Sequence, residues 1–392
     1  MEFILTEEQL AVQEAAREFT QKELLPGVID RDREMKYPRE QVRKLGELGF
    51  LGMMVSPEYG GGGMDTLSYV LAMEEISKVD SSVSVIMSVN NSLVCWGLEE
   101  YGNETQKSTY LPKLASGEWI GSFCLSEPEA GSDATSQRTI AVDQGDHYLV
   151  NGTKNWITNG GTSHLHLVMA QTHPEKGHRG INALIVETEW PGVNVGAKED
   201  KLGIRASDTH TIMYNDVRVP KTHRIGDDGF GFKFAMKTLS GGRIGIAAQA
   251  LGIAAGAYEL AVKYSKEREA FGKPISQHQA IAFKLADMAT EIEAARLLVY
   301  RAAWMKDQGM DYTSAAAMAK LFASEVAMKH TVEAVQIHGG YGFVKEYHVE
   351  RLMRDAKITQ IYEGTSEMQR VVISRNILQG QLYEPIWKTE NA

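Results

Sequence analysis

Apolar residues recur three and four positions apart along most of the first third of the chain and again along its last part. This spacing places apolar side chains on one face of a helix and predicts long helical segments. A helix should also begin near Glu7, because Thr6 and Gln9 have the spacing of a capping box. Alanine-rich stretches after residue 243 favour a packed helical bundle. The helical pattern runs through residues 64–79, 84–102, 243–269, 279–306 and 313–340.

The pattern changes between residues 123 and about 225, where short runs are rich in β-branched and aromatic residues. Runs such as HYLV, KNWIT, HLHLVMA and INALIVE are typical of strands. Between the first two, Asn151-Gly152 is a dipeptide that favours a hairpin turn. The order predicts a mainly α fold with a central β domain. We expect an N-terminal helical domain at 1–122, the β domain at 123–227 and a C-terminal helical bundle at 228–392.

Composition and charge exclude several classes of protein. The chain has 392 residues, of which 43% are hydrophobic, as expected for a globular protein with a large core. Its net charge of -10 argues against nucleic-acid binding, which needs clustered cations. Cys95 and Cys124 are the only cysteines, so neither a disulfide framework nor a structural zinc site is expected. His164 and His166 alternate on a predicted strand without a third ligand nearby, and we expect no metal site.

Two further features concern location and nucleotide binding. No apolar run reaches the roughly 18 residues of a membrane span, and the start of the chain is acidic rather than Arg-rich, so we expect a cytoplasmic protein without a span. The glycines at 60–63 are not followed by the GK[ST] of a phosphate loop and are predicted to form a turn. No GxGxxG follows a strand, which excludes a Rossmann-type dinucleotide site.

Several short stretches still carry residues suited to a flat polar cofactor. CLSEPEAGSDAT at 124–135 gathers small residues and hydroxyls, and NWITN at 155–159 places an indole two residues from a hydroxyl. REAFGKPISQHQ at 268–279 and QIHGGYG at 336–342 add a cation, amides and a diglycine. Each stretch alone has a structural explanation, such as core packing, a surface ion pair or a helix cap. Glu363, in YEGTS, would alone be an acid at a helix start.

These motifs together resemble the acyl-CoA dehydrogenase family from end to end. CLSEPEAGSDA, NGTKNWITNG, GRIGIAAQALGIA, REAFGKPISQHQAI, QIHGGYG and RDAKITQIYEGTSE follow in the family's order. VIMSVNNSL and KEDKLGIR make the chain most similar to the short-chain, butyryl-CoA type. The resemblance implies a central β-barrel or sandwich between an N-terminal helical domain and a C-terminal four-helix bundle, bound FAD, and a homotetramer. Electrons would pass to electron-transferring flavoprotein.

The resemblance also implies roles for individual residues. Arg268, Gln279 and the stretch 336–340 would reach the FAD of a neighbouring subunit, so that the FAD sites are shared between subunits. Substrate contacts would come from Ser132, Ser240, Arg243 and Gly364, with Ser207 as a weaker candidate. The cofactor positions carried over are Phe123, Leu125, Ser126, Gly131, Ser132, Trp156, Ile157, Thr158, Arg268, Phe271, Gln279, Gln336, Gly339, Gly340, Thr365 and Ser366.

Glu363 matches the position of the family's catalytic base. Removing a weakly acidic α-proton from an acyl thioester needs a stronger base than a free carboxylate, whose pKa is about 4.3. Exclusion of water, hydrogen bonds to the thioester oxygen and fixed geometry would each help. Other members carry the acid near position 242, where this chain has Gly242. The chain departs from many short-chain members at Ser240, where they have an acid.

The resemblance therefore implies FAD-dependent α,β-dehydrogenation of short-chain acyl-CoA to trans-2-enoyl-CoA, in fatty-acid β-oxidation or butyrate metabolism. Alternatives left open are a medium- or branched-chain preference, reaction with oxygen as an oxidase, the enoyl-CoA reductase direction, and a noncatalytic acyl-CoA-binding flavoprotein. A processed eukaryotic chain of this type would lie in the mitochondrial matrix instead of the cytoplasm.

Overall fold

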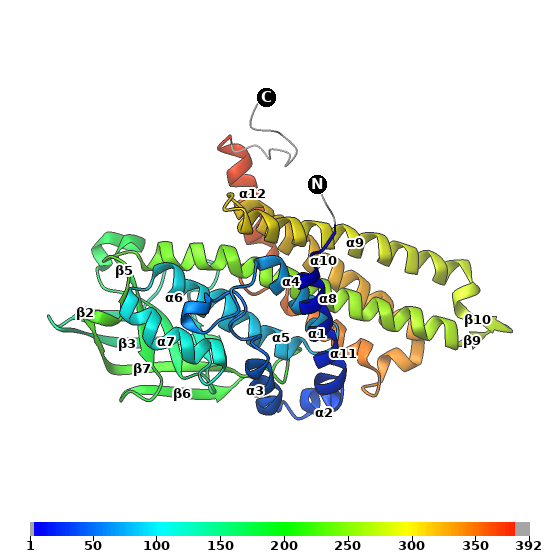
Figure 1. The fold of residues 1–392 in the computed structure, drawn as a ribbon, viewed down its shortest axis with the longest axis horizontal. Coiled ribbons are helices and arrows are strands. Elements are labelled where there is room, and N and C mark those ends of the chain that lie inside the picture. Colours follow the sequence, from blue (N-terminus) through cyan, green and yellow to red (C-terminus); the bar gives the residue numbers. More distant parts are fainter. Residues whose placement is uncertain (1–3, 381–392) are drawn as a thin grey trace.

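The computed structural model describes residues 4–380, and the remaining ends of the expected first and third domains lie outside that range. Helices dominate the N-terminal part (Figure 1). The capping box predicted at the first of them is confirmed, since Thr6 and Gln9 bond to each other's backbone N–H. The helices are α1 (Glu7–Phe19), α2 (Val28–Arg33), α3 (Arg39–Glu47), α4 (Thr66–Ser77), α5 (Ser81–Ser88), α6 (Trp96–Tyr101) and α7 (Glu104–Ser116), with π-helical turns at Thr20–Leu24 and Val89–Cys95.

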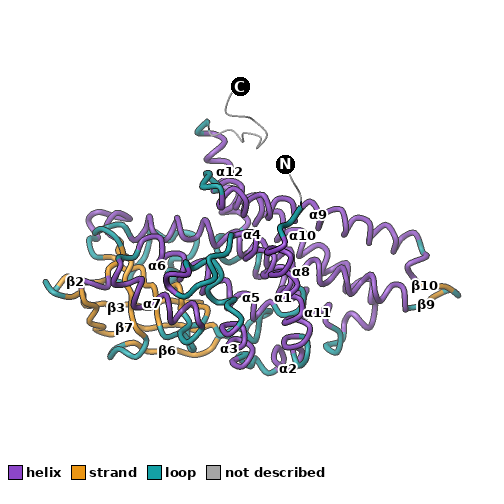
Figure 2. The backbone as a smooth tube through the Cα atoms, viewed as in Figure 1, coloured by secondary structure: helices purple, strands orange, loops and turns teal. Residues whose placement is uncertain are grey.

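The middle of the chain forms one mainly antiparallel sheet, drawn in orange in Figure 2. Its strand order is β6-β7-β3-β2-β4-β5-β8, and β1 pairs in parallel with β4. The strands are β1 (Gly121–Cys124), β2 (Ile140–Asp143), β3 (His147–Thr158), β4 (Leu165–Gln171), β5 (Ile181–Glu187), β6 (Val193–Lys198), β7 (Thr209–Pro220) and β8 (Arg224–Ile225). The predicted central β region is therefore present.

The hairpin predicted at Asn151-Gly152 is wrong. β3 runs through both residues without turning and pairs with β2 on one side and β7 on the other. The pairing with β7 shifts register beside Gly152, so the dipeptide marks a bulge. A Cβ at Gly152 would lie 2.6 Å from the Thr139 Cα. The glycine is needed for this close backbone approach and not for a turn.

Long helices return after the sheet. They are α8 (Gly231–Glu267), α9 (Gln279–Asp307), α10 (Thr313–His338), α11 (His348–Ile358) and α12 (Ser366–Leu378), and the short strands β9 (Glu269–Ala270) and β10 (Lys273–Pro274) join α8 to α9. α4, α8, α9 and α10 share one apolar core, in which alanines allow close packing. In Figure 1 the sheet lies at one end of the molecule and the β9–β10 ribbon at the other.

Helix α8 is long and apolar enough to cross a membrane by length and composition, although the sequence has no uninterrupted apolar run of that length. Of its most apolar window, 83% is buried inside the protein. This burial explains the apolar composition, because a helix surrounded by other helices is hydrophobic on all sides.

The glycines at 60–63 form a turn, as predicted. The N–H groups of Gly62 and Gly63 donate to the carbonyls of Gly52 and Val55, at 2.9 and 2.8 Å. A Cβ at Gly61 would overlap the Val55 carbonyl oxygen. These N–H groups are thus bonded within the chain and do not form a phosphate cradle.

Candidate active site

The turn between α11 and α12 presents Glu363 in an unusual backbone conformation. Glu363 and Gly364 both have positive φ, 51° and 91°, which is a strained conformation for glutamate. Two side chains hold the turn by hydrogen bonds. Lys320 Nζ of α10 and Gln369 Nε2 of α12 both donate to the Gly364 carbonyl, at 2.7 and 2.8 Å. Strain that is held in this way is typical of functional sites.

The Glu363 carboxylate points toward helix α8. Its Oε2 is buried and accepts no hydrogen bond from the part of the chain that the structure describes. Burial raises the pKa of Glu363 to about 7, against the opposing charges of Lys320 and Arg243. A carboxyl group with one buried, free oxygen and a near-neutral pKa is suited to accept a proton from a bound molecule.

Gly242 of α8 makes room for this carboxylate. A Cβ at position 242 would overlap Glu363 Oε2 and would lie 2.7 Å from Leu93 Cδ2. Position 242 therefore lies directly against the acid, on the helix where other members of the resembled family carry theirs. Because residue 242 is a glycine and carries no acid, Glu363 supplies the carboxylate at this point.

We expect Gly242→Ala to slow turnover by about 10²-fold, because displacing a reacting group by about 1 Å costs that much. The matched control is Gly241→Ala. A Cβ at Gly241 would meet only Tyr312 Oη at 3.7 Å and Lys306 Nζ at 3.8 Å, which are ordinary contacts. Steady-state rates of the two variants test the expectation. Equal rates would show that the carboxylate does not need the space at position 242.

The predicted substrate residues are placed unequally around Glu363. Arg243 is buried on α8 and interacts electrostatically with Glu363, and its Nε has no hydrogen-bond partner among the described residues. Ser240 Oγ donates to its own helix, to the Met236 carbonyl at 3.0 Å. Ser207 is fully buried, and its Oγ finds no partner within residues 4–380. Arg243 is the substrate candidate with the clearest free polar atom beside the acid.

A second group of predicted residues gathers where β1 and β3 end. Ser122 Oγ donates to the Thr158 carbonyl at 2.9 Å, and the Asn155 N–H donates to the Ser126 carbonyl at 2.9 Å. Trp156, whose backbone φ is 57°, is 54% exposed, whereas Asn155 is half-buried and Ile157 is buried. An exposed indole beside a threonine is suited to stack on a planar ring and bond its edge.

The other residues of this group differ in what they offer. Phe123 is half-buried, and Leu125 is buried. The side chain of Ile157 is in the core of the sheet, so only its backbone is available to a ligand. Gly131 and Ser132 are exposed, with open space where a Cβ of residue 131 would lie.

A buried ion pair anchors the loop that carries Ser126 and Ser132. The Nζ of Lys154, on β3, donates to Glu127 Oε1 at 2.7 Å, to Gln137 Oε1 at 3.0 Å and to the Leu125 carbonyl at 3.0 Å. Lys154 has no exposed surface. Burial would raise the pKa of Glu127, but the Lys154 charge and backbone N–H donors hold that pKa below its ordinary value. The loop is thereby fixed to the strand that bears Trp156.

The third group of predicted residues lies at the opposite end of the molecule, near β9 and β10 (Figure 1). Arg268, Gly339 and Gly340 line a cavity of about 620 Å³. The Arg268 guanidinium lies 5.8 Å from the centre of the Tyr341 ring, which also borders the cavity. Phe271 is 96% exposed, and Gln279 and Gln336 are exposed as well. One chain therefore does not bring these residues to Trp156 or Glu363.

Thr365 and Ser366 lie next to Glu363 at the start of α12. Thr365 caps the helix, its hydroxyl accepting the Met368 N–H at 3.3 Å. Ser366 is buried, and its Oγ bonds to nothing in the described chain. Buried polar atoms are usually hydrogen-bonded, so this hydroxyl lacks its expected partner within residues 4–380.

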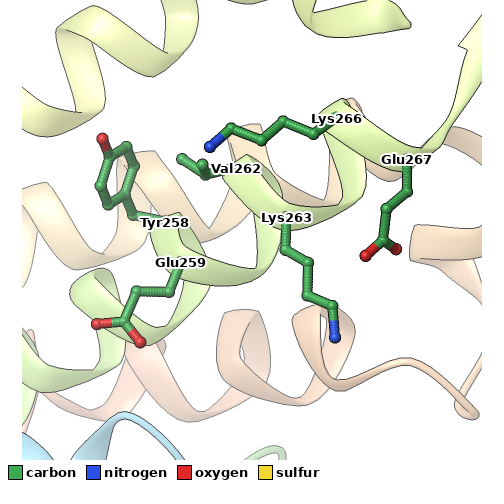
Figure 3. Close-up of a pocket in the computed structure, with 6 residues that line it drawn as sticks. All are labelled: Tyr258, Glu259, Val262, Lys263, Lys266 and Glu267. Atoms are coloured by element: carbon green, nitrogen blue, oxygen red, sulfur yellow. The ribbon is translucent and has the colours of Figure 1, made fainter.

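Other concave or titratable places do not form a competing site. A groove of about 390 Å³ on α8 contains none of the predicted residues, and Figure 3 shows its lining side chains on that single helix. Both cysteines are free and buried. His166 bonds within the core to Ser163 and Tyr214, and the His164 ring stacks on Trp119. No group of three metal-ligating side chains occurs in residues 4–380.

The sequence reasoning missed two residues that the structure places at the acid. Lys320 and Gln369 were not candidates, yet both hold the turn of Glu363. The signal for Lys320 was a single cation in the otherwise apolar run AAAMAKLFA. A lysine in such a stretch is costly to bury unless it has a specific partner.

Known proteins resemble the chain over nearly its whole length. Residues 6–118, 122–217 and 229–378 match the N-terminal, middle and C-terminal domains of acyl-CoA dehydrogenase. A short-chain-specific acyl-CoA dehydrogenase of Clostridium acetobutylicum is 51% identical over 96% of this chain and 100% of its own.

Two solved structures extend this likeness to the fold. Butyryl-CoA dehydrogenase from Megasphaera elsdenii is 49% identical with a TM-score of 0.95, over 96% of this chain and 100% of that one. A chain from a structure titled as the electron transferring flavoprotein of Acidaminococcus fermentans is 51% identical with a TM-score of 0.96, over 97% and 100% of the two chains. The family resemblance of the motifs is confirmed: the chain belongs to the acyl-CoA dehydrogenase family and is an oxidoreductase of that kind.

Proposed function

We propose that the protein catalyses the FAD-dependent α,β-dehydrogenation of short-chain acyl-CoA thioesters to trans-2-enoyl-CoA. The observation that carries this proposal is the Glu363 carboxylate, buried against Gly242 with a free oxygen and a pKa raised to about 7. Acyl-CoA dehydrogenation as such follows from the family and from relatives named short-chain specific and butyryl-CoA dehydrogenase. The process served would be fatty-acid β-oxidation or butyrate metabolism.

In this proposal Glu363 removes the α-proton of the thioester. Its positive φ turns the carboxylate toward α8, and burial keeps water away, so that the carboxylate is a stronger base than in solvent. The substrate would be contacted by Arg243, Ser132, Ser240 and Gly364, with Ser207 as a further candidate. The Glu363 N–H would donate to the thioester oxygen and stabilise the charge that develops there.

Members of the family are flavoproteins, and the residues of this chain fit FAD. The exposed Trp156 ring offers a flat surface, and Thr158, Ser126 and the open backbone at Gly131 offer polar groups around it. Bound FAD would supply the acceptor for the substrate's β-hydrogen, taken as hydride at flavin N5. The remaining proposed cofactor contacts are Phe123, Leu125, Ser132, Ile157, Thr365 and Ser366.

We propose that a neighbouring subunit completes each FAD site in a homotetramer. Support comes from the position of Arg268, Gly339 and Gly340, which line one cavity near the β9–β10 ribbon, at the end of the molecule opposite to the sheet that carries Trp156. Phe271, Gln279 and Gln336 are exposed in the same region. FAD binding would then depend on assembly by mass action. The proposed domains are 1–122, 123–227 and 228–392.

We propose electron-transferring flavoprotein as the electron acceptor and the cytoplasm as the location. The acceptor is supported by the structural neighbour whose title names such a flavoprotein. The location is supported by the bacterial source of the similar relative from Clostridium.

An anaerobic titration of the purified protein with butyryl-CoA tests the proposal. We expect the visible flavin absorbance to bleach, because the substrate's hydride reduces the cofactor. A yellow protein that does not bleach with any acyl-CoA would contradict catalysis, and a colourless protein that stays without flavin after addition of FAD would contradict the cofactor. Fast reaction of the bleached protein with oxygen would indicate an oxidase instead of a dehydrogenase.

Butyryl-CoA is expected to give a higher kcat/KM than octanoyl-CoA or lauroyl-CoA. Gln249 of α8 is fully buried, accepts from the Tyr362 hydroxyl next to Glu363, and donates to the Ser81 carbonyl and Ser84 Oγ of α5. This bonded side chain fills space between the helices beside the acid. One extra or missing methylene in an apolar pocket changes the discrimination between substrates by about 1–3 kcal/mol. The difference in kcat/KM between substrates that differ by several carbons should therefore be large. Fastest turnover of the twelve-carbon substrate would contradict the prediction.

A further inference from the structure

Lys320 is a fully buried cation that the proposed chemistry does not itself use. It lies on α10, and its Nζ donates to the Gly364 carbonyl at 2.7 Å. Gln369 Nε2 donates to the same oxygen at 2.8 Å and to the Glu363 carbonyl at 3.3 Å. One carbonyl of the strained turn thus receives one charged and one neutral donor. The neutral donor already satisfies that carbonyl, so a hydrogen bond alone does not explain a buried lysine.

Electrostatics gives Lys320 a second relation to the acid. Its charge is the largest single influence that opposes the effect of burial on Glu363, ahead of that of Arg243. Burial in turn lowers the pKa of Lys320 to about 7, with Glu363 acting in the opposite direction. Two groups that both titrate near neutrality and interact will titrate as a pair.

We propose that Lys320 is a positioning residue for Glu363: it fixes the Gly364 carbonyl, so that the acid stays against Gly242, and its charge favours the ionised carboxylate. The inference rests on the proposed role of Glu363 as the base. Other charged or titratable groups interact with this pair from each neighbouring element. They are Arg243 of α8, Glu367 of α12, Tyr69 of α4 and Tyr362 of the turn itself.

The test compares Lys320→Met with Gln369→Met in the FAD-loaded protein. Both changes remove a donor to the Gly364 carbonyl, but only the first removes a charge. We expect both variants to turn over more slowly. In Lys320→Met alone, the rise of kcat/KM with pH should move to higher pH by about one unit, because loss of a neighbouring cation raises the pKa of a carboxyl group. Lys320→Gln, a neutral donor, should show the same displacement if Lys320→Met does not fold.

A second readout does not depend on turnover. Infrared difference spectra against Glu363→Gln isolate the stretch of the protonated Glu363 carboxyl group, and a pH series gives its titration. The same displacement in Lys320→Met would support the proposal. Unchanged infrared titration in Lys320→Met and Lys320→Gln would overturn it and leave Lys320 a packing residue. If the infrared titration moves but the pH dependence of kcat/KM does not, the Lys320 effect stands and Glu363 is not the base.

Discussion

Replacing Glu363 by glutamine should reduce the rate of flavin bleaching by butyryl-CoA by at least about 10²–10⁴-fold, the usual contribution of a positioned general base. The amide has nearly the same shape as the carboxyl group, so the turn and its bonds from Lys320 and Gln369 to the Gly364 carbonyl should persist. An amide cannot accept the α-proton at neutral pH. FAD content and substrate binding should therefore remain, and stopped-flow absorbance would measure the loss.

The pH dependence of the unmodified protein provides an internal check on this prediction. Burial raises the pKa of Glu363 to about 7, and a base must be ionised to act. The bleaching rate should therefore rise with pH and level off above about 7, and the residual rate of Glu363→Gln should lack this rise. Glu8→Gln is the control, because Glu8 is an exposed acid on α1, outside the turn of Glu363 and the helices that hold it. Bleaching of Glu363→Gln near the normal rate would place the base elsewhere.

Local signals allowed the helices to be predicted from sequence. The capping box at Thr6 and Gln9 uses contacts within one turn, and such contacts depend little on the rest of the fold. Glu363 was predicted as the base because its neighbours follow a family's motif, although its positive φ could not be read from its own residue type. Likewise, only the three-dimensional arrangement shows that the sheet carrying Trp156 and the β9–β10 ribbon next to Arg268 lie at opposite ends of the molecule.

Contacts between distant segments account for what the sequence did not reveal. Asn151-Gly152 favours a hairpin locally, but Thr139 of the adjacent strand region approaches Gly152 so closely that the glycine serves a bulge. Tertiary packing overrode the local turn preference. Lys320 is 44 residues from Gly364 in sequence, and no local pattern relates them. A sequence motif does not indicate which distant side chain bonds to a backbone carbonyl, because every residue has that carbonyl.

Removal of Lys154, the buried cation that bonds to the 125–139 loop, should have the largest effect on stability. We expect Lys154→Met to lower the free energy of unfolding by about 3–5 kcal/mol, because removal of one partner leaves an uncompensated charge in the interior. That charge belongs to Glu127, which would keep the backbone N–H groups of Arg138 and Thr139 as donors, at 2.6 and 3.1 Å, but would lose the cation that balances it. Denaturant unfolding at fixed protein and FAD concentration would measure the change.

Two further variants separate buried charge from lost packing. Lys221→Met removes a lysine whose ion pair with Asp143 is partly exposed, and it should lose much less stability than Lys154→Met. Lys154→Met combined with Glu127→Gln removes both charges and should recover part of the loss, since an amide is cheaper to bury than a carboxylate. A loss no larger than that of Lys221→Met would show that the pair is not needed. FAD should also dissociate faster from Lys154→Met, because the loop that Lys154 anchors carries the proposed cofactor residue Ser126, whose carbonyl accepts the N–H of Asn155 next to the exposed Trp156.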